Sequence, residues 1–219
     1  MGKESPEARM AATAPLAAQY GLGNPIRVFE KPAVLATSGE FHVFEHGAIW
    51  LNNKKAVRQP GSGATFLLPW QRIAEYYQST THVRSTVSHD EYRFRFRAFD
   101  WQSPEALDIA GLYKEQDGWN ELNGLIERPI ASAQLPWIFN ALQQGQPVDF
   151  GLLTVTPYGL VKPRKNKQVA WGDMEGMWVR NGWMALRAQG KVWGKWELGG
   201  LANRLAFFTL LERFNVPIN

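Results

Sequence analysis

The stretch from Pro147 to Phe214 decides the fold and reads PVDFGLLTVTPYGLVKPRKNKQVAWGDMEGMWVRNGWMALRAQGKVWGKWELGGLANRLAFFTLLERF. Short apolar runs alternate in it with turn residues, which is typical of antiparallel strands joined by tight connections. The pair Asn181-Gly182 is a strong hairpin signal, because both residues tolerate positive φ. After Gly199-Gly200, leucine and phenylalanine recur every three or four residues, which predicts an amphipathic helix. We therefore expect an α+β unit, mainly antiparallel β, that is closed by a C-terminal helix.

An earlier part of the chain repeats this order of elements. Residues 40–52 (EFHVFEHGAIWLN) predict a strand, a turn at Gly47 and a second strand, and the same pattern surrounds Gly159. Trp70 then takes the place of Trp171, and the extra residues of the first copy fit the insertion-like loop at 54–64. The same order found twice predicts two copies of one unit in tandem.

This repeat sets the expected domain boundaries. Residues 1–25 are expected to be a mobile or loosely docked leader, residues 26–146 the first unit and residues 147–219 the second. The segment 117–145 predicts the closing helix of the first unit followed by a second helix. Pro129 and Pro136 should break or kink this run, since each lacks a backbone donor.

The run LPWIFNALQQGQPVDFGLLTVTPYGLV (135–161), followed by QVAWGDMEGMWVRNG (168–182), resembles uncharacterised bacterial proteins built from pleckstrin-homology-like domains. Such proteins enter the second sheet through a step that matches Gly145, Val148, Phe150 and Gly151, and a tryptophan, here Trp171, precedes the next strand. The resemblance covers residues 40–214 and implies two pleckstrin-homology-like units in tandem. It implies a binding or scaffolding module and carries no catalytic residue.

Composition narrows the classes of function. The chain has 219 residues and no cysteine, which excludes disulfides and thiolate chemistry. It has no apolar run of membrane-spanning length, no secretory leader pattern and no G-x-S-x-G or phosphate-binding G-x-x-x-x-G-K motif. We expect no enzyme and no cofactor, and a cytoplasmic location that could be peripheral to the inner face of the membrane.

The sharpest catalytic match is His42-Val43-Phe44-Glu45-His46, which fits the H-x-x-E-H pattern of one class of zinc metallopeptidases. That pattern works on a helix, where both histidines share a face. Here the apolar residues alternate around a glycine turn, which predicts a hairpin. We therefore expect two partly exposed strand histidines and no metal site, with a zinc hydrolase as a remote alternative.

Positive charge gathers in the second unit. The net charge is +4, and the sequence KPRKNK (162–167) places Lys162, Arg164, Lys165 and Lys167 at one hairpin tip. Such a tip in pleckstrin-homology domains is a usual site for an anionic head group. About 1 kcal/mol per basic residue gives roughly 4 kcal/mol, a millimolar affinity. Peripheral binding to anionic lipid is therefore the alternative function, and a solvated loop is the plainer interpretation.

Arg93, Arg95 and Arg97 form a second basic row. On a strand they share one face, and the aromatic residues between them share the other. Base stacking needs aromatic rings on the same face as the charge. We therefore expect solvent-facing arginines, buried aromatic rings and no nucleic-acid binding.

Tryptophan is abundant, with ten in the chain and five between residues 171 and 196. Alternation cannot place all five in the core, and Trp193 and Trp196 should point to opposite faces of their strand. Trp183 follows the hairpin turn. Because exposed tryptophans are frequent at binding hot spots, we expect Trp183, Trp193 and Trp196 to mark a surface for a protein partner or for self-association.

Overall fold

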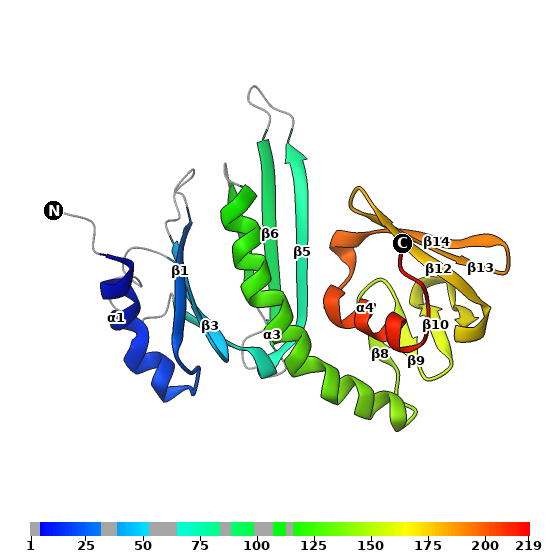
Figure 1. The fold of residues 1–219 in the computed structure, drawn as a ribbon, viewed down its shortest axis with the longest axis horizontal. Helices are drawn as coiled ribbons and strands as arrows, with labels where there is room; N and C mark the ends of the chain where they lie inside the picture. The colour runs from blue at the N-terminus through cyan, green and yellow to red at the C-terminus, as the bar shows by residue number, and fades with distance from the viewer. Residues whose placement is uncertain (1–4, 32–38, 53–64, 84–88, 99–106, 113–115) are drawn as a thin grey trace.

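The computed structural model describes residues 5–31, 39–52, 65–83, 89–98, 107–112 and 116–219. It is an α+β fold of mostly antiparallel sheets, arranged as a row from the N-terminal helix to the second unit (Figure 1). Its helices in the described ranges are α1 (Pro6–Gln19), α3 (Gln116–Gln143) and α4 (Arg204–Arg213).

Each half of the chain holds a four-stranded sheet, then a three-stranded sheet, then a helix. The first half contains β1 (Pro25–Lys31), β2 (Gly39–Phe44), β3 (Gly47–Leu51) and β4 (Thr65–Pro69), then β5 (Ile73–Val83), β6 (His89–Ala98) and β7 (Leu107–Leu112), then α3. The second half contains β8 (Val148–Asp149), β9 (Thr154–Thr156), β10 (Gly159–Lys162) and β11 (Lys167–Ala170), then β12 (Met174–Arg180), β13 (Trp183–Ala188) and β14 (Lys191–Glu197), then α4. Short 3-10 turns join the sheets: η1 (Trp70–Arg72) and η3 (Trp171–Asp173).

The two halves also share a hydrogen bond at equivalent places. The indole N–H of Trp70 donates to the carbonyl of Glu45 (3.1 Å), two residues before the turn glycine. The indole N–H of Trp171 donates to the carbonyl of Pro157 (3.0 Å), again two residues before the turn glycine. The expected correspondence of the two tryptophans therefore has a structural basis, since each ties its 3-10 turn to the first hairpin of its half.

Helix α3 is continuous through Pro129 and Pro136, where the sequence predicted two helices, and it changes direction along its length (Figure 1). Its N-terminal part packs in the first core through Leu122, Ile126 and Ile130. Its C-terminal part packs in the second core through Ala131, Ile138 and Leu142. One helix therefore serves both halves, and packing on both cores offsets the cost of the two prolines.

The N-terminal segment differs from the expected leader, because residues 6–19 form α1. Ser5 caps this helix by accepting the N–H of Ala8 (3.2 Å). Met10, Thr13 and Ala17 are buried along one side of α1. An N-cap and one buried side therefore hold this segment as a helix, although its sequence lacks a strong hydrophobic periodicity.

A local turn separates the short strands β8 and β9. Gly151 has φ +79°, and its N–H donates to Oδ1 of Asp149 (2.9 Å). This local turn lets β8 and β9 pair with each other as a hairpin.

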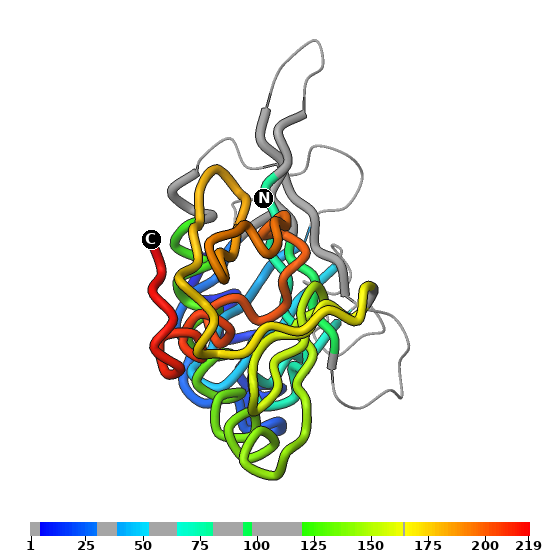
Figure 2. The backbone as a smooth tube through the Cα atoms, turned by 90° about the vertical axis from the view of Figure 1, so that its right-hand side faces the viewer, coloured from blue at the N-terminus to red at the C-terminus, as the bar shows by residue number. Residues whose placement is uncertain are grey.

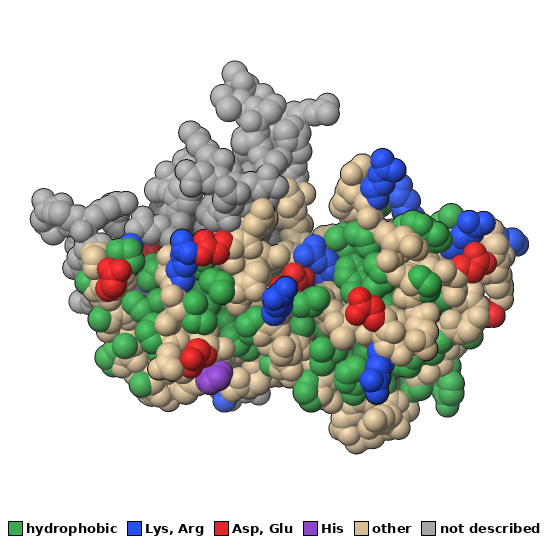
Figure 3. Space-filling model, viewed as in Figure 1, with side chains coloured by type: hydrophobic (Ala, Val, Ile, Leu, Met, Phe, Trp, Pro, Cys, Tyr) green, Lys and Arg blue, Asp and Glu red, His purple; other side chains and the backbone are tan. Residues whose placement is uncertain are grey.

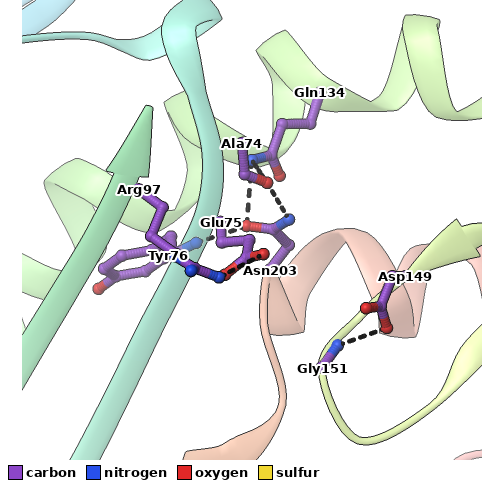
Figure 4. Close-up of polar contacts among 8 residues, drawn as sticks. All are labelled: Ala74, Glu75, Tyr76, Arg97, Gln134, Asp149, Gly151 and Asn203. Atoms are coloured by element: carbon purple, nitrogen blue, oxygen red, sulfur yellow. Dashed lines mark hydrogen bonds and ion pairs between the residues drawn. The ribbon is translucent and has the colours of Figure 1, made fainter. Parts of the chain in front are cut away.

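A buried polar contact joins the halves at the start of α4 (Figure 4). Asn203 is 5% exposed, and its Oδ1 accepts the N–H of Tyr76 (2.8 Å) and Nε2 of Gln134 (3.0 Å). Its Nδ2 donates to the carbonyl of Ala74 (2.8 Å). Because buried amides must be hydrogen-bonded, this contact specifies how the second half meets strand β5.

The last residues pair with the second three-stranded sheet. The N–H of Met177 donates to the carbonyl of Pro217 (2.7 Å), and the N–H of Asn219 donates to the carbonyl of Met177 (2.8 Å). Figure 2 shows this C-terminal segment in red at the edge of the second half. Strand β12 therefore has β13 on one side and an extended piece of the chain on the other.

Candidate functional site

Two exposed tryptophans lie on the outer face of the β12–β13–β14 sheet. Trp178 is opposite Ala185 and Trp183 is opposite Arg180 in the β12–β13 register. Alternation therefore places both rings on the same face as diagonal neighbours. Trp178 is 39% exposed and Trp183 is 41% exposed, which is unusual for residues of this size.

The turn between β12 and β13 fixes this arrangement. Asn181 (φ +52°) and Gly182 (φ +75°) both adopt the left-handed conformation, as a two-residue hairpin turn of the predicted kind requires. With Arg180 paired to Trp183, the turn leaves no freedom in the register. The local sequence therefore determines that Trp183 lies beside the turn and on the face of Trp178.

Two basic side chains lie beside the Trp183 ring. The Lys195 ammonium lies 4.6 Å from the centre of the Trp183 ring, within the range of a cation–π contact. Arg180 is exposed beside it. A shallow pocket of about 270 Å³ opens among these residues, lined also by Asn181, Met184 and Ala185. The exposed Glu197 lies on the same face, since it is the cross-strand partner of Trp183 in β14. The face is thus aromatic at its centre and carries charges of both signs at its rim, as protein interfaces do.

Trp193 and Trp196 do not point to opposite faces, which corrects the expectation from alternation. The β13–β14 register shifts between Leu186 and Arg187, so that Trp193 is an extra residue on β14. Such a bulge reverses the alternation beyond it. The two rings lie 5.8 Å apart and are partly buried, so the exposed aromatic surface belongs to Trp178 and Trp183.

Lys162 fills the space beside this tryptophan pair. Its ammonium lies 4.1 Å from the Trp193 ring centre and 5.2 Å from that of Trp196, and it donates to the Trp193 carbonyl. Burial, together with the positive charges of Lys165 and Lys167, lowers the pKa of Lys162. This lysine is therefore a packing residue that ties the basic hairpin to β14.

The other basic residues of this hairpin tip differ from Lys162. Lys165 and Lys167 are exposed, Lys165 in the 3-10 turn η2 (Pro163–Lys165) and Lys167 at the start of β11. The side chain of Arg164 lies outside the described residues. Lys162 therefore lies apart from the exposed Lys165 and Lys167, since it packs on Trp193 and Trp196.

A second hollow lies between the halves, beside Trp183. The cleft has a volume of about 410 Å³ and opens between β5 and the β12–β13 turn (Figure 3). One wall carries Gln78, Ser79 and Thr80, and the other carries Asn181, Gly182, Trp183 and the residues from Glu197 to Gly199. Arg204 also lines the cleft, and it pairs with Glu127 (3.2 Å).

The arginine row of β6 lies on the face of the strand opposite the aromatic residues. Phe94 and Phe96 are 1% and 2% exposed, which confirms that the aromatic face is core. Arg97 donates to Glu75 (3.0 Å), and Arg95 is exposed. The side chain of Arg93 lies outside the described residues.

The H-x-x-E-H segment lies in a strand and the turn after it, so its two histidines do not share the face of a helix. His42 lies in β2 and is 1% exposed. Its Nε2 lies 2.9 Å from Oε2 of Glu40, and its Nδ1 lies 3.0 Å from Oγ1 of Thr13, both within hydrogen-bond distance. His46 is exposed in the turn that follows, so the expectation of two partly exposed strand histidines was wrong for both. The part of the chain that the structure describes contains no cluster of three potential metal ligands.

The buried Thr13, His42 and Glu40 have the order of a nucleophile, a base and an orienting carboxylate. Thr13 is 0% exposed, so no substrate could reach its hydroxyl. The contacts instead fasten α1 to β2, reinforced by Arg9, which lies 2.8 Å from Glu40. Burial raises the pKa of Glu40, but the hydrogen bonds from His42 and Arg9 outweigh it, so that its pKa lies below the usual value.

Trp178, Arg180 and Lys195 also belong to the face, although they were not among the residues predicted for a binding surface. The sequence contains enough information to place two of them. A two-residue turn at Asn181-Gly182 pairs Arg180 with Trp183, and strand alternation then puts Trp178 on the same face as Arg180. Lys195 could not be placed, because the bulge at Trp193 changes which β14 residues face outward.

Within the described residues, no helix is long and apolar enough to cross a membrane. No known protein-family model matches the chain, and no curated protein matches it.

Proposed function

We propose that this chain is a non-catalytic binding or scaffolding protein of two pleckstrin-homology-like units in tandem, which binds a protein partner in the cytoplasm. The repeated order of a four-stranded sheet, a three-stranded sheet and a closing helix supports the tandem assignment. The equivalent tryptophan hydrogen bonds of the two halves support it as well.

The exposed pair of Trp178 and Trp183 is the observation that carries the choice of a protein partner. Roughly 40% of a side chain of about 250 Å² leaves about 100 Å² of each ring accessible. At about 25 cal/mol per Å², covering both rings would contribute about 5 kcal/mol to association. That is the scale of a hot-spot pair at the centre of a protein interface.

Anionic lipid is the second candidate, supported by the exposure of Lys165 and Lys167. At about 1 kcal/mol per lysine, these two side chains contribute about 2 kcal/mol near an anionic surface. This is too little for stable attachment without a further anchor. The aromatic face therefore favours the protein partner.

The test is quantitative affinity purification of the tagged full-length chain from bacterial cells that express it. We expect a set of proteins that co-purifies with the wild type and is lost from the W178A/W183A variant. The matched control is Tyr158→Ala, which removes an aromatic side chain that is 74% exposed at the β9–β10 turn. Loss of the same proteins from the control, or their retention by the double variant, contradicts the proposal.

Liposome sedimentation tests the second candidate, binding to anionic lipid. Sedimentation with neutral and anionic liposomes is measured for the wild type and for K165A/K167A, which spares the packed Lys162. Salt-sensitive binding to anionic liposomes that this variant loses would replace the protein assignment with the lipid one. A second copy of the chain as the only recovered protein would identify the face as a self-association surface.

A further inference from the structure

The outer face of the β12–β13–β14 sheet presents its side chains in two rows that run across the three strands. The rows follow from the register, because cross-strand partners lie side by side and share a face. The first row is Arg180, Trp183 and Glu197, and the second is Trp178, Ala185 and Lys195. Met184, between the two rows on β13, is buried, as alternation requires. The rows therefore lie about 7 Å apart on one face of the sheet.

At the two outer strands the rows carry groups that favour contact with each other. On β14 the first row has the carboxylate of Glu197 and the second has the ammonium of Lys195, and both side chains are exposed. On β12 the first row has the guanidinium of Arg180 and the second has the exposed ring of Trp178. Opposite charges attract, and a cation is attracted to the face of an aromatic ring. Each row is therefore complementary to the other row at both of its ends.

At the central strand the two rows are complementary in shape. The first row has the ring of Trp183, which is 41% exposed, and the second has Ala185, which has the smallest side chain of either row. Side chains of two sheets that pack face to face interdigitate, so a large side chain fits best over a small one. The ring of Trp183 would therefore fit over Ala185 of a second copy of this face.

A two-fold axis that crosses the strands between the two rows brings all of these contacts together. It lays the first row of each copy over the second row of the other, so that every contact occurs twice. The alternative two-fold axis, along β13, lays each residue of β13 over its own copy. That arrangement would oppose two Trp183 rings and, one row further on, two exposed Arg187 side chains. Shape and charge therefore favour the axis across the strands.

The size of the face suits a reversible dimer. The exposed side chains of the two rows leave on the order of 500 Å² accessible in each copy, so a pair of faces would bury about 1,000 Å². This area is near the lower limit for a specific interface between proteins. Each charged group of the two rows would have a partner in the second copy, which limits the cost of removing it from water.

We infer that the partner of this face is a second copy of the chain, which packs on it through a two-fold axis across the strands of the β12–β13–β14 sheet. This inference rests on the proposed function, because it names the protein that covers Trp178 and Trp183. The contact between Lys195 of one copy and Glu197 of the other is its most specific consequence.

Sedimentation velocity of the purified full-length chain between about 1 and 100 μM tests this contact. We expect the wild type to show a monomer–dimer equilibrium. Lys195→Glu and Glu197→Lys each bring like charges together twice, so each variant alone should dimerise at least tenfold more weakly. An equimolar mixture of the two variants should dimerise within about fivefold of the wild type, because residues 195 and 197 of the two chains again have opposite charges.

The matched control is Glu212→Lys, which makes the same change of charge at an exposed position of α4 and should leave dimerisation unchanged. The mixture also controls for folding, since an unfolded variant could not restore the dimer. A mixture that stays monomeric, or a W178A/W183A variant that dimerises like the wild type, overturns the inference.

A wild type that is monomeric at every concentration overturns it as well. If other proteins still co-purify with that monomer and are lost from W178A/W183A, the second copy is refuted and the proposed function stands. If the chain is monomeric and the double variant loses no protein, both are refuted.

Discussion

Replacement of Asn203 by alanine should cost more stability than any single change at an exposed turn of this chain. The change leaves the buried N–H of Tyr76 without its acceptor and removes the main donor to the carbonyl of Ala74. Each unsatisfied buried group costs about 1–3 kcal/mol. Asn203 also has φ +48°, where alanine is strained by about 1 kcal/mol. We therefore expect a loss of about 3–5 kcal/mol.

Urea unfolding followed by tryptophan fluorescence measures this loss. Asn203→Gly should lie about 1 kcal/mol closer to the wild type, because glycine adopts positive φ without strain. The matched control is Asn215→Ala, which carries the same backbone strain (φ +56°) at an exposed position. We expect the Asn203 variants also to broaden or split the transition, since the contact joins the halves. An Asn203→Ala variant that is no less stable than Asn215→Ala would refute this account of the junction.

Three further predictions concern packing and pH. Gly194→Ala should lower the stability of the fold, because a methyl group at residue 194 would overlap the Trp196 ring. The displaced tryptophans should become more accessible to a fluorescence quencher. Quenching equal to that of the wild type would contradict this. The lowered pKa of Glu40 means that its carboxylate stabilises the fold above about pH 4 and that this contribution is lost as the pH falls through the folded-state pKa. Urea midpoints should therefore show Glu40→Gln less stable than the wild type at pH 7, with the difference shrinking at pH 3, and a constant difference would contradict the assignment. Burial and the charge of Glu75 raise the pKa of Tyr77 to about 12, so its neutral form should stabilise the fold below pH 10 and cease to do so as the pH rises from about 10 to 12. Ultraviolet titration of Tyr77→Phe should lack the tyrosine ionisation near pH 12, and an unchanged curve would refute this.

The elements that local sequence determines were predictable. Asn181-Gly182 specified its hairpin because both residues accept the left-handed conformation, and the structure places them there. The match of Trp70 with Trp171 predicted the repeated order of sheets, since both rings perform the same task in their halves. Alternation also predicted that Phe94 and Phe96 are core.

Elements that depend on distant contacts were not predictable. Helix α3 continues through Pro129 and Pro136 because two cores hold it, and neither core is visible in the local pattern. Helix α1 is fastened by the buried Thr13 and His42, a contact between residues far apart in the sequence. Propensity alone cannot anticipate such tertiary support.

Only part of the candidate site was predictable, because some of its residues are placed by the local turn and others by contacts with distant residues. Trp183 was expected at the surface because it follows the turn, and it is exposed. Lys162 was expected at an exposed tip, yet it packs on Trp193 and Trp196 across a sheet boundary. One bulged residue in β14 decided which tryptophans face the solvent, and no residue type in that strand specifies a bulge.

The central claim is that the face of Trp178 and Trp183 contacts a protein partner, and photo-crosslinking in cells tests it most directly. A photoreactive phenylalanine analogue at Ala185, which lies opposite Trp178, would be within reach of any protein on this face. The same analogue at the exposed Tyr158 is the control. We predict a discrete protein adduct from residue 185 that is absent from residue 158 and that W183A abolishes. No adduct from residue 185, or the same adduct from both sites, would contradict the account.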